Sequence, residues 1–319
     1  MDRRAFLAAF GSFLTAAPAA AASARARVGM LGPPEEPRYA QLARGLREGL
    51  RDHGHADAQL ELIEVRADRR DRKAAQAAVE QLQQRGASVV FVVGSELARL
   101  AREFATAMPI VFITPGDPVA TGLVASFARP GGNMTAITFE FPELSGKRLD
   151  LLKALNPAAR RALVVYDPGD ASSRQGLDAA RSVGNDVGLT IVEGAVTPSG
   201  GAKAAQFADV DGVVLVPGGA ALRFAPQVIR AAHQRRLPTV VHARTPATAD
   251  AVISYGASDL TAARQAARLV DRVLRGARAG DLPVERPAKL ELVINRAAAT
   301  AIGVAVPSAL LVRADSVID

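Results

Sequence analysis

Residues 88–114, SVVFVVGSELARLAREFATAMPIVFIT, decide the fold class of this chain. The segment opens with SVVFVVG, a continuous β-branched run that is typical of a strand buried on both faces of a parallel sheet. Apolar residues at helical spacing follow over Leu97–Met108, and Ile110–Thr114 is a second β-rich run. A strand, a helix and a strand in this order predict a right-handed crossover within an α/β fold.

The same alternation extends in both directions as two successive series. The first series predicts strands at Val28–Leu31 and Leu60–Val65 and a helix at Tyr39–His53. The second series begins after Glu143 and predicts helices at Lys147–Leu155, Ser173–Val187 and Phe224–Arg235 and strands at Arg161–Asp167, Leu189–Val196, Gly212–Val216 and Thr239–Ala243. Pro198–Gly201 leaves room for only a short helix around Ala202–Phe207 in one crossover. We therefore expect two similar lobes, each built on a parallel sheet.

The first 24 residues have the pattern of an export signal. Arg3 and Arg4 precede a 13-residue apolar run, Ala5–Ala17, and Ala22-Ser23-Ala24 is a small-x-small cleavage pattern. A membrane-spanning helix needs about 20 apolar residues, so the run is too short to span a bilayer. Arg-Arg-Ala-Phe-Leu also resembles the twin-arginine signal. We expect residues 1–24 to be removed, leaving a periplasmic, soluble protein that starts near Arg25.

Composition excludes several function classes. The sequence has no cysteine, which excludes disulfides, thiolate metal sites, a cysteine nucleophile and a lipoprotein anchor. Without residues 1–24 the formal charge is +6, from 37 basic and 31 acidic residues. The arginines are spread singly along predicted helices and aromatic residues make up 4%, which favours solvated helix faces over a nucleic-acid surface. His53-Gly54-His55 reads as an exposed helix end, and we expect no metal site and no cofactor.

Residues 114–135, TPGDPVATGLVASFARPGGNMT, follow a predicted strand and are rich in glycine and proline. Such residues lie where the backbone must turn or approach another group closely. Ligands of open parallel sheets bind beyond the carboxyl ends of the strands, so the loops that follow strands are the candidate site. Six loops meet this criterion: Gly32–Pro37, Gly94–Glu96, Thr114–Pro118, Asp167–Ser173, Pro217–Ala220 and Tyr255–Asp259.

Four residues of the first series are candidates for ligand contact or for local structure. Ser95 is placed to cap a helix whose free amides and dipole favour an anion. Thr114 ends a buried strand and offers a hydroxyl donor. Asp117 either accepts from a ligand amine or anchors a turn. Glu96 would be unfavourable beside a bound carboxylate, so we expect it to turn outward and stabilise the helix start.

The second series offers a parallel set. Asp167 follows a predicted strand and is either the partner of a ligand ammonium group or part of an Asp-Pro-Gly turn, and Ser172 or Ser173 lies on the same loop. Pro217-Gly218-Gly219 allows close backbone approach without chemistry of its own. Tyr255 offers a ring for stacking on a ligand, and Asp259 is expected to cap a helix over Leu260–Leu274. These residues do not form a catalytic set of nucleophile, base and orienting group.

Four long segments of this sequence resemble a known family. They are IVFITPGDPVATGLVASFARPGGNMTAITF at 110–139, ELSGKRLDLLK at 143–153, ISYGASDL at 253–260 and DLPVERPAKLELVINRAAATAIGVAVPSALLVRADSVID at 281–319. The family is that of ABC-transporter substrate-binding proteins, whose members include receptors for tryptophan and related compounds. The resemblance covers nearly the whole chain after residue 24, and the sequence departs from it mainly at 197–210 and 242–250.

The resemblance implies the type I periplasmic-binding-protein fold, with two Rossmann-like lobes and the ligand between them. It also implies three crossings between the lobes, which we place near Ala136–Phe139, Ser254–Gly256 and Leu282–Glu285. The expected first lobe then comprises residues 25–138 and 255–282, and the second lobe comprises residues 139–254 and 283–319. The helix at Leu260–Leu274 would return to the first lobe and a strand at Leu290–Asn295 to the second.

The expected function is that of a periplasmic solute receptor. The resemblance implies a monomer that closes on a small amino-acid-like or aromatic carboxylate and delivers it to an ABC permease, with no nucleic acid involved. It further implies that Ser95, Thr114 and nearby amides hold the ligand carboxylate. An exported enzyme on the same two-lobed fold is the alternative, disfavoured because no catalytic constellation is recognisable. A sugar-repressor-like regulator would need a DNA-binding helix-turn-helix where the export signal lies.

Overall fold

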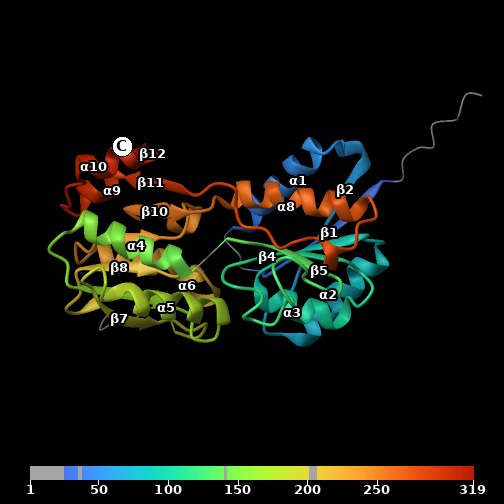
Figure 1. The fold of residues 1–319 in the computed structure, drawn as a ribbon, viewed down its shortest axis with the longest axis horizontal. Coiled ribbons are helices and arrows are strands. Elements are labelled where there is room, and N and C mark those ends of the chain that lie inside the picture. Colours follow the sequence, from blue (N-terminus) through green and yellow to red (C-terminus); the bar gives the residue numbers. More distant parts are fainter. Residues whose placement is uncertain (1–24, 35–37, 140–141, 201–206) are drawn as a thin grey trace, which may run out of the picture.

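The computed structural model describes residues 25–34, 38–139, 142–200 and 207–319. Over these residues the strands form a five-stranded sheet in the order β2-β1-β3-β4-β5 and a seven-stranded sheet in the order β12-β11-β10-β9-β8-β6-β7. Each sheet is covered by helices, and the two lobes lie side by side (Figure 1). The predicted α/β class with parallel sheets in two lobes is confirmed. The predicted export signal and residues 201–206 of the predicted short helix lie outside the described residues.

The first lobe holds elements from two separate parts of the chain. Its strands are β1 (Ala26–Gly32), β2 (Leu60–Arg66), β3 (Val89–Val93), β4 (Ile110–Thr114) and β5 (Met134–Thr138). Its helices are α1 (Tyr39–Asp52), α2 (Arg72–Gln84), α3 (Ser95–Phe104) and α8 (Asp259–Leu274), with 3-10 turns at Asp57–Gln59 and Ala279–Asp281. All its strand pairs are parallel.

The second lobe contains the remaining elements. Its helices are α4 (Pro142–Leu155), α5 (Ala171–Gly184), α6 (Gly219–Arg223), α7 (Ala225–His233), α9 (Arg296–Ala301) and α10 (Ser308–Arg313), with a 3-10 turn at Pro246–Thr248. Its strands are β6 (Arg161–Tyr166), β7 (Thr190–Ala195), β8 (Gly212–Leu215), β9 (Thr239–Val241), β10 (Ile253–Gly256), β11 (Glu291–Asn295) and β12 (Ser316–Ile318). The β10–β11 pair is antiparallel, whereas β11 and β12 pair in parallel.

The core of the first lobe consists of two apolar layers on the two faces of its sheet. All five residues of β3 and all five of β4 are buried, as their unbroken apolar sequence predicts. One layer packs α1 and α8 against the sheet, and the other packs α2 and α3 (Figure 1). The α1–α8 contact depends on glycine, since a Cβ atom on Gly45 would lie 2.3 Å from the Leu260 carbonyl oxygen. Two helices far apart in sequence thereby pack as neighbours.

The core of the second lobe is also two-layered. Apolar side chains of α4, α5, α9 and α10 pack on one face of the seven-stranded sheet, and those of α6 and α7 pack on the other. Helix α4 buries Leu149, Leu152 and Leu155. Figure 1 shows α9, α10 and β12 together at the end of the lobe remote from the first lobe. The C-terminal segment therefore extends the sheet away from the cleft.

Several element boundaries differ from those predicted. The helix predicted at Leu97–Met108 ends at Phe104, and the Asn133 side-chain amide donates to the carbonyl oxygens of Ala105 and Met108 that the helix leaves free. Pro109 favours this early end because the residue before a proline disfavours helical geometry. The helix predicted at Lys147–Leu155 begins earlier, at Pro142, a residue well suited to the first turn. The short helix α6 was not predicted.

Three segments connect the lobes. The chain leaves the first sheet after Thr138 in β5 and leaves the second sheet after Gly256 in β10. The third connection follows Glu285, because Glu285 is still held by β5 through backbone hydrogen bonds with Ala136 and Thr138. The three segments predicted as crossings therefore lie at the points where the chain leaves each sheet.

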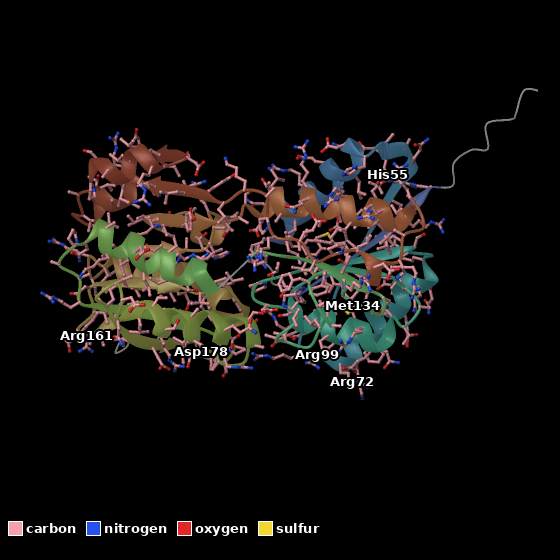
Figure 2. All side chains as sticks on the ribbon, in the orientation of Figure 1. His55, Arg72, Arg99, Met134, Arg161 and Asp178 are labelled. Carbon is pink, nitrogen blue, oxygen red and sulfur yellow. The ribbon has the colours of Figure 1, made fainter. Side chains whose placement is uncertain are left out.

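Exposed arginines cover both lobes. Figure 2 shows Arg72 and Arg99 on the first lobe and Arg161 on the second, each extending from the surface. Arg72 and Arg99 both lie within ion-pair distance of Glu103 on α3, at 3.0 Å and 3.8 Å. These are solvated helix faces, as the spacing of the arginines predicts.

Candidate ligand-binding site

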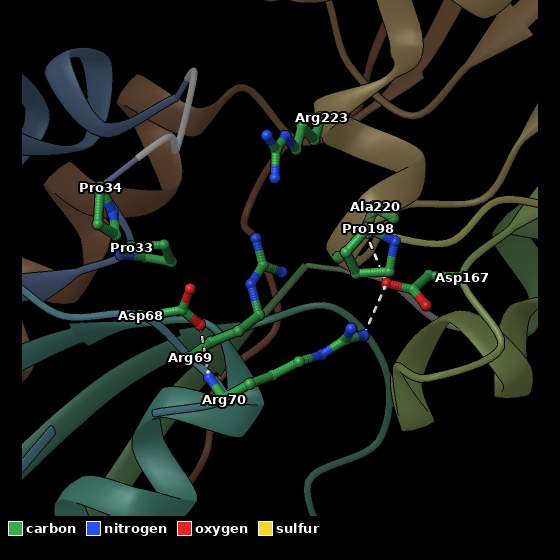
Figure 3. Close-up of a pocket in the computed structure, with 10 residues that line it drawn as sticks. Pro33, Pro34, Asp68, Arg69, Arg70, Asp167, Pro198, Ala220 and Arg223 are labelled. Atoms are coloured by element: carbon green, nitrogen blue, oxygen red, sulfur yellow. Dashed lines mark hydrogen bonds and ion pairs between the residues drawn. The ribbon is translucent and has the colours of Figure 1, made fainter. Parts of the chain in front are cut away.

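Two adjoining cavities lie between the lobes. The larger has a volume of about 200 Å³ and the smaller about 20 Å³. Pro33, Arg69 and Gly219 line both, so the two form one continuous cleft. The larger cavity is lined by Pro33, Pro34, Asp68, Arg69 and Arg70 of the first lobe and by Asp167, Pro198, Gly219, Ala220 and Arg223 of the second (Figure 3).

Every wall of the cleft comes from loops at the carboxyl ends of strands or from the helix starts that follow them. In the first lobe these are the loops after β1, β2, β3 and β4. In the second lobe they are the loops after β6, β7 and β8. Parallel strands bring their carboxyl ends to one edge of each sheet, and here the two edges face each other. The cleft is therefore where the sheet topology predicts a ligand site.

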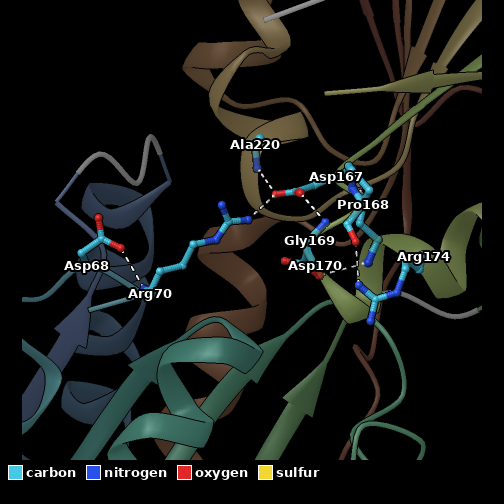
Figure 4. A network of polar contacts seen from close by, with 9 residues as sticks. Asp68, Arg70, Asp167, Pro168, Gly169, Asp170, Arg174 and Ala220 are labelled. Atoms are coloured by element: carbon cyan, nitrogen blue, oxygen red, sulfur yellow. Dashed lines mark hydrogen bonds and ion pairs between the residues drawn. The ribbon is translucent and has the colours of Figure 1, made fainter. Parts of the chain in front are cut away.

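Asp167 is the most constrained of the predicted site residues (Figure 4). It is 1% exposed, and its two carboxylate oxygens accept hydrogen bonds from the backbone N–H groups of Gly169 at 2.8 Å and Ala220 at 2.7 Å. Arg70 of the first lobe approaches within 3.6 Å of the same carboxylate. Gly219 must lack a side chain, because a Cβ atom there would lie 2.0 Å from Asp167 Oδ2. Asp167 thus joins two loops of its own lobe and faces the other lobe.

Ser95 and Ser172 meet across the cleft. Their hydroxyl oxygens are 3.4 Å apart, and Ser95 lines the smaller cavity. Ser95 is not the helix cap that its position predicts. Gly94 holds that place with a positive φ of 94°, and Ser95 is the first residue of α3. Both serines lie in the first turns of helices that point at each other from the two lobes.

Thr114 and Asp117 bond to the chain's own backbone. Thr114 is 1% exposed, and its hydroxyl donates to the Pro115 carbonyl oxygen at 2.8 Å. The Asp117 carboxylate accepts from the backbone N–H groups of Val119 at 2.7 Å and Ala120 at 3.2 Å, which is the turn-anchoring alternative. The N–H group of Asp117 donates across the cleft to Gln175 Oε1 at 2.9 Å. The glycine- and proline-rich loop therefore meets the second lobe through its backbone.

Pro217 and Tyr255 lie outside the lining of the two described cavities. Pro217 is buried between β8 and α6. Tyr255 packs against the apolar core of the second lobe, and its carbonyl oxygen accepts from Arg148 Nε at 2.9 Å. In this structure the Tyr255 ring is therefore not placed to stack on a ligand in either cavity, because it already contacts core residues.

The sequence interpretation missed the loop Asp68–Arg70 and misplaced Glu96. The loop follows β2, so the strand-end criterion that selected the other loops would have selected it as well. Glu96 was expected to turn outward, yet it lines the smaller cavity together with Asp170. Burial, followed by the charge of Asp170, raises the pKa of Glu96 to about 7, against lowering effects of Arg69 and Arg70. Burial also raises the pKa of Asp170.

A buried polar cluster lies beside the cleft. Arg38 and Asp259 form an ion pair at 3.1 Å in which each side chain is 3% exposed. Asp259 was expected to cap α8, but Ser258 holds the cap position and Asp259 is the first helical residue. The Arg38 guanidinium lies 5.0 Å from the ring centre of Phe139, whose ring is 6.3 Å from that of His242. Burial, and then the charges of Arg38 and Arg148, lowers the pKa of His242 well below its usual value.

Residues 25–34, 38–139, 142–200 and 207–319 include no helix that is long and apolar enough to cross a membrane. The same part of the chain holds no group of three or more histidine, cysteine, aspartate or glutamate side chains arranged to hold a metal ion.

Comparisons with known proteins agree with this architecture. The chain is 23% identical over 264 residues to a tyrosine-binding protein of Clostridioides difficile, an alignment that covers 82% of this chain and 76% of that protein. It superposes with a TM-score of 0.81 on an ABC domain from Streptococcus pneumoniae solved in complex with L-Trp, with 21% identity over 92% of this chain and 100% of that one. A conserved domain protein of Vibrio cholerae gives a TM-score of 0.80 and 25% identity, covering 92% and 99% of the two chains.

A family model decides the assignment. It matches residues 27–318, almost all of the chain after the predicted export signal. The match includes every strand and helix that contributes to the cleft, in both lobes. This protein belongs to the family of ABC transporter substrate-binding proteins.

Proposed function

We propose that this protein is a periplasmic receptor that binds a small amino-acid-like or aromatic carboxylate ligand between its lobes and delivers it to an ABC permease for import. Family membership supports a receptor rather than an enzyme. The similarity to a tyrosine-binding protein and to a structure solved with L-Trp supports this ligand class. The N-terminal sequence supports export, and the mature protein works as a monomer.

The single observation that carries this proposal is the cleft itself. A cavity of about 200 Å³ is lined by loops of both lobes, and the chain passes between the lobes three times. Rotation about such connections opens and closes a cleft without disturbing either core. A ligand that contacts both lobes therefore stabilises the closed arrangement, and a permease can recognise that arrangement.

The predicted contact residues fall into two groups in this proposal. Ser95, Asp167 and Ser172 lie where the lobes meet and contact the ligand directly or through water. Thr114, Asp117, Pro217 and Tyr255 hold the loops and connections in place, because their polar groups or rings already contact the chain. Substitutions in the first group are expected to affect affinity and those in the second group stability, and Asp167 is expected to affect both, because its carboxylate also accepts two backbone hydrogen bonds.

Ligand-dependent thermal stability tests the proposal. L-Trp, L-Tyr, L-Phe and small aromatic carboxylates are added to the mature protein, and melting is followed by circular dichroism, since the chain has no tryptophan. A ligand at 100 times its dissociation constant adds about 2.7 kcal/mol of stability. The matched control is Glu103→Gln, an exposed change on α3 away from the cleft. If no amino acid or aromatic carboxylate raises the melting temperature at millimolar concentration, the proposed ligand class is wrong.

Export is tested separately. N-terminal sequencing of the protein recovered from the periplasm is expected to begin near Arg25, and Arg3→Lys with Arg4→Lys should block export if the signal is of the twin-arginine type. An intact Met1 on a protein found only in the cytoplasm would contradict the periplasmic assignment.

A further inference from the structure

Carboxyl groups from both lobes meet at the smaller cavity. Glu96 lies in the first turn of α3 in the first lobe, and Asp170 is the N-cap of α5 in the second lobe. Both line the cavity of about 20 Å³, and the charges of Asp170 and Asp167 both act on Glu96. The two lobes therefore place like charges against each other at the point where they close.

Among the described residues, the three carboxyl groups differ in their hydrogen-bond partners. The Asp170 carboxylate accepts from the N–H group of Ser173 at 3.0 Å, and Asp167 accepts from two backbone amides as described above. Glu96, by contrast, has no hydrogen bond and no ion pair with any residue in the described part of the chain. A half-buried carboxyl group that no described residue pairs with, at a cavity between two lobes, is arranged to receive a polar group of a ligand.

The neighbouring arginines do not supply that partner. Arg70 extends to Asp167 and Arg38 is paired with Asp259. The charge of Arg69 lowers the pKa of Glu96 from a distance. Figure 3 shows, however, that the Arg69 guanidinium is directed into the larger cavity toward Arg223. Guanidinium groups outnumber carboxyl groups at the larger cavity, where Arg69, Arg70 and Arg223 lie with Asp68 and Asp167. At the smaller cavity Glu96 and Asp170 meet Arg69 and the Arg38 side chain that is paired with Asp259.

Closure changes the surroundings of Glu96. Because Glu96 belongs to the first lobe and Asp167 and Asp170 belong to the second, we expect opening of the cleft to separate them and to expose the Glu96 carboxyl group to water. When the lobes meet, burial and the two aspartates raise its pKa to about 7. An acid whose pKa rises on closure binds a proton more tightly in the closed state, so the closed state gains as pH falls from about 7 toward the ordinary glutamate value.

We propose that Glu96 is the closure and selectivity residue of the cleft: the lobes close stably only over a proton on Glu96 or over a ligand ammonium group bound beside it. The inference rests on the proposed function and deepens it, because it narrows the ligand class to α-amino acids. The ammonium group lies at the smaller cavity near Glu96 and Ser95, and the carboxylate faces Arg69 in the larger cavity.

This orientation reverses the one expected from sequence. A ligand carboxylate beside Ser95 would lie next to Glu96 and Asp170 and would add a further negative charge to a partly buried cluster. At the larger cavity a carboxylate meets the planar guanidinium of Arg69, whose geometry suits bidentate binding. Charge complementarity therefore outweighs the helix dipole of α3, which by itself would favour the ligand carboxylate beside Ser95.

The first experiment needs no ligand. Small-angle scattering compares the mature wild-type protein with Glu96→Gln at about pH 5.5 and about pH 8.5. The wild type is expected to be more compact at the lower pH, and Glu96→Gln equally compact at both, because glutamine has the same shape without the titrating charge. Glu103→Gln on the exposed end of α3 should behave as the wild type does. A wild type without pH response, or a Glu96→Gln variant that retains it, would overturn the proposal.

The second experiment uses matched ligand pairs at about pH 8.5. L-Trp is compared with indole-3-propionate, and L-Tyr with 3-(4-hydroxyphenyl)propionate, since each pair differs only in the amino group. The wild type is expected to prefer the amino acid, and Glu96→Gln to lose about tenfold or more of that preference. A variant with unchanged preference refutes the role of Glu96 and leaves the receptor function intact. A wild type that binds none of the four probes refutes the proposed ligand class, while the pH-dependent compaction still decides the role of Glu96 in closure.

Discussion

Replacing Asp167 by asparagine tests whether this residue stabilises the second lobe or chiefly binds Arg70 across the cleft. The buried carboxylate accepts two backbone hydrogen bonds, from Gly169 and Ala220. Hydrogen bonds to a charged group contribute about 1.5–3 kcal/mol each. Asparagine can keep one of them as a neutral bond of about 1 kcal/mol, while its NH₂ group faces the other N–H donor. We therefore expect Asp167→Asn to lower the free energy of unfolding by about 2–5 kcal/mol.

The matched control removes the other partner of the same ion pair. Arg70 is 44% exposed and lies 3.6 Å from Asp167, so Arg70→Met should cost less than about 1 kcal/mol. Both variants are unfolded in urea with far-ultraviolet circular dichroism as the signal. Hydrogen exchange provides the local readout, since only Asp167→Asn should speed exchange of the Gly169 and Ala220 amides.

The refuting result is specific. If Arg70→Met destabilises the protein as much as Asp167→Asn, the contact between the lobes dominates and the backbone hydrogen bonds do not. If Asp167→Asn changes stability by less than about 0.5 kcal/mol, the carboxylate makes no net contribution to the fold. Either outcome would contradict the view that Asp167 joins two loops of its own lobe.

Three further predictions concern helix packing, pH and affinity. Gly49→Ala should lower stability by about 1–3 kcal/mol despite a gain in helix propensity, because a Cβ atom there would lie 2.5 Å from a backbone carbonyl oxygen of α8. If urea unfolding shows the variant to be more stable than the wild type, this packing is contradicted. The pKa of His242 is lowered in the fold, so its contribution to stability should fall by up to about 1.4 kcal/mol per pH unit as pH drops below about 6.5, where the unfolded chain takes up the proton, while Glu96, whose pKa is raised in the fold, contributes with the opposite sign. In urea titrations at several pH values the wild type should therefore lose more stability on acidification than His242→Phe, and equal slopes would disprove the assignment. In calorimetric titrations, Ser95→Ala should weaken amino-acid binding about tenfold. Thr114→Val should weaken it by less than about threefold, because the Thr114 hydroxyl already donates to the Pro115 carbonyl oxygen. Equal losses of affinity would indicate that Thr114 contacts the ligand.

Local sequence predicted those parts of the fold that are set by residues close together in the chain. The apolar run of β3 and its neighbouring helix and strand were recognised because a strand buried on both faces needs an unbroken β-branched sequence. The turn anchored by Asp117 was among the alternatives, since an Asx turn involves only residues two or three apart. Family resemblance in four segments added the two-lobed architecture, which the structure confirms.

The orientation of individual side chains in the cleft depended on tertiary contacts. Glu96 faces Asp170, and Asp259 pairs with Arg38 more than two hundred residues away along the chain. No local pattern predicts such pairs, because each arises where two lobes or two distant helices meet.

The sequence by itself determined that this chain forms two α/β lobes and that the candidate site lies at the strand ends, because hydrophobic periodicity and backbone preferences act over a few residues. Only the tertiary structure decided which strand-end residues face one another, that Thr114 turns to its own backbone, and that Glu96 and Asp170 of different lobes line one cavity. The physical reason is that burial and the field of distant charges set the protonation and pairing of a carboxyl group such as Glu96, and both exist only once the lobes are packed.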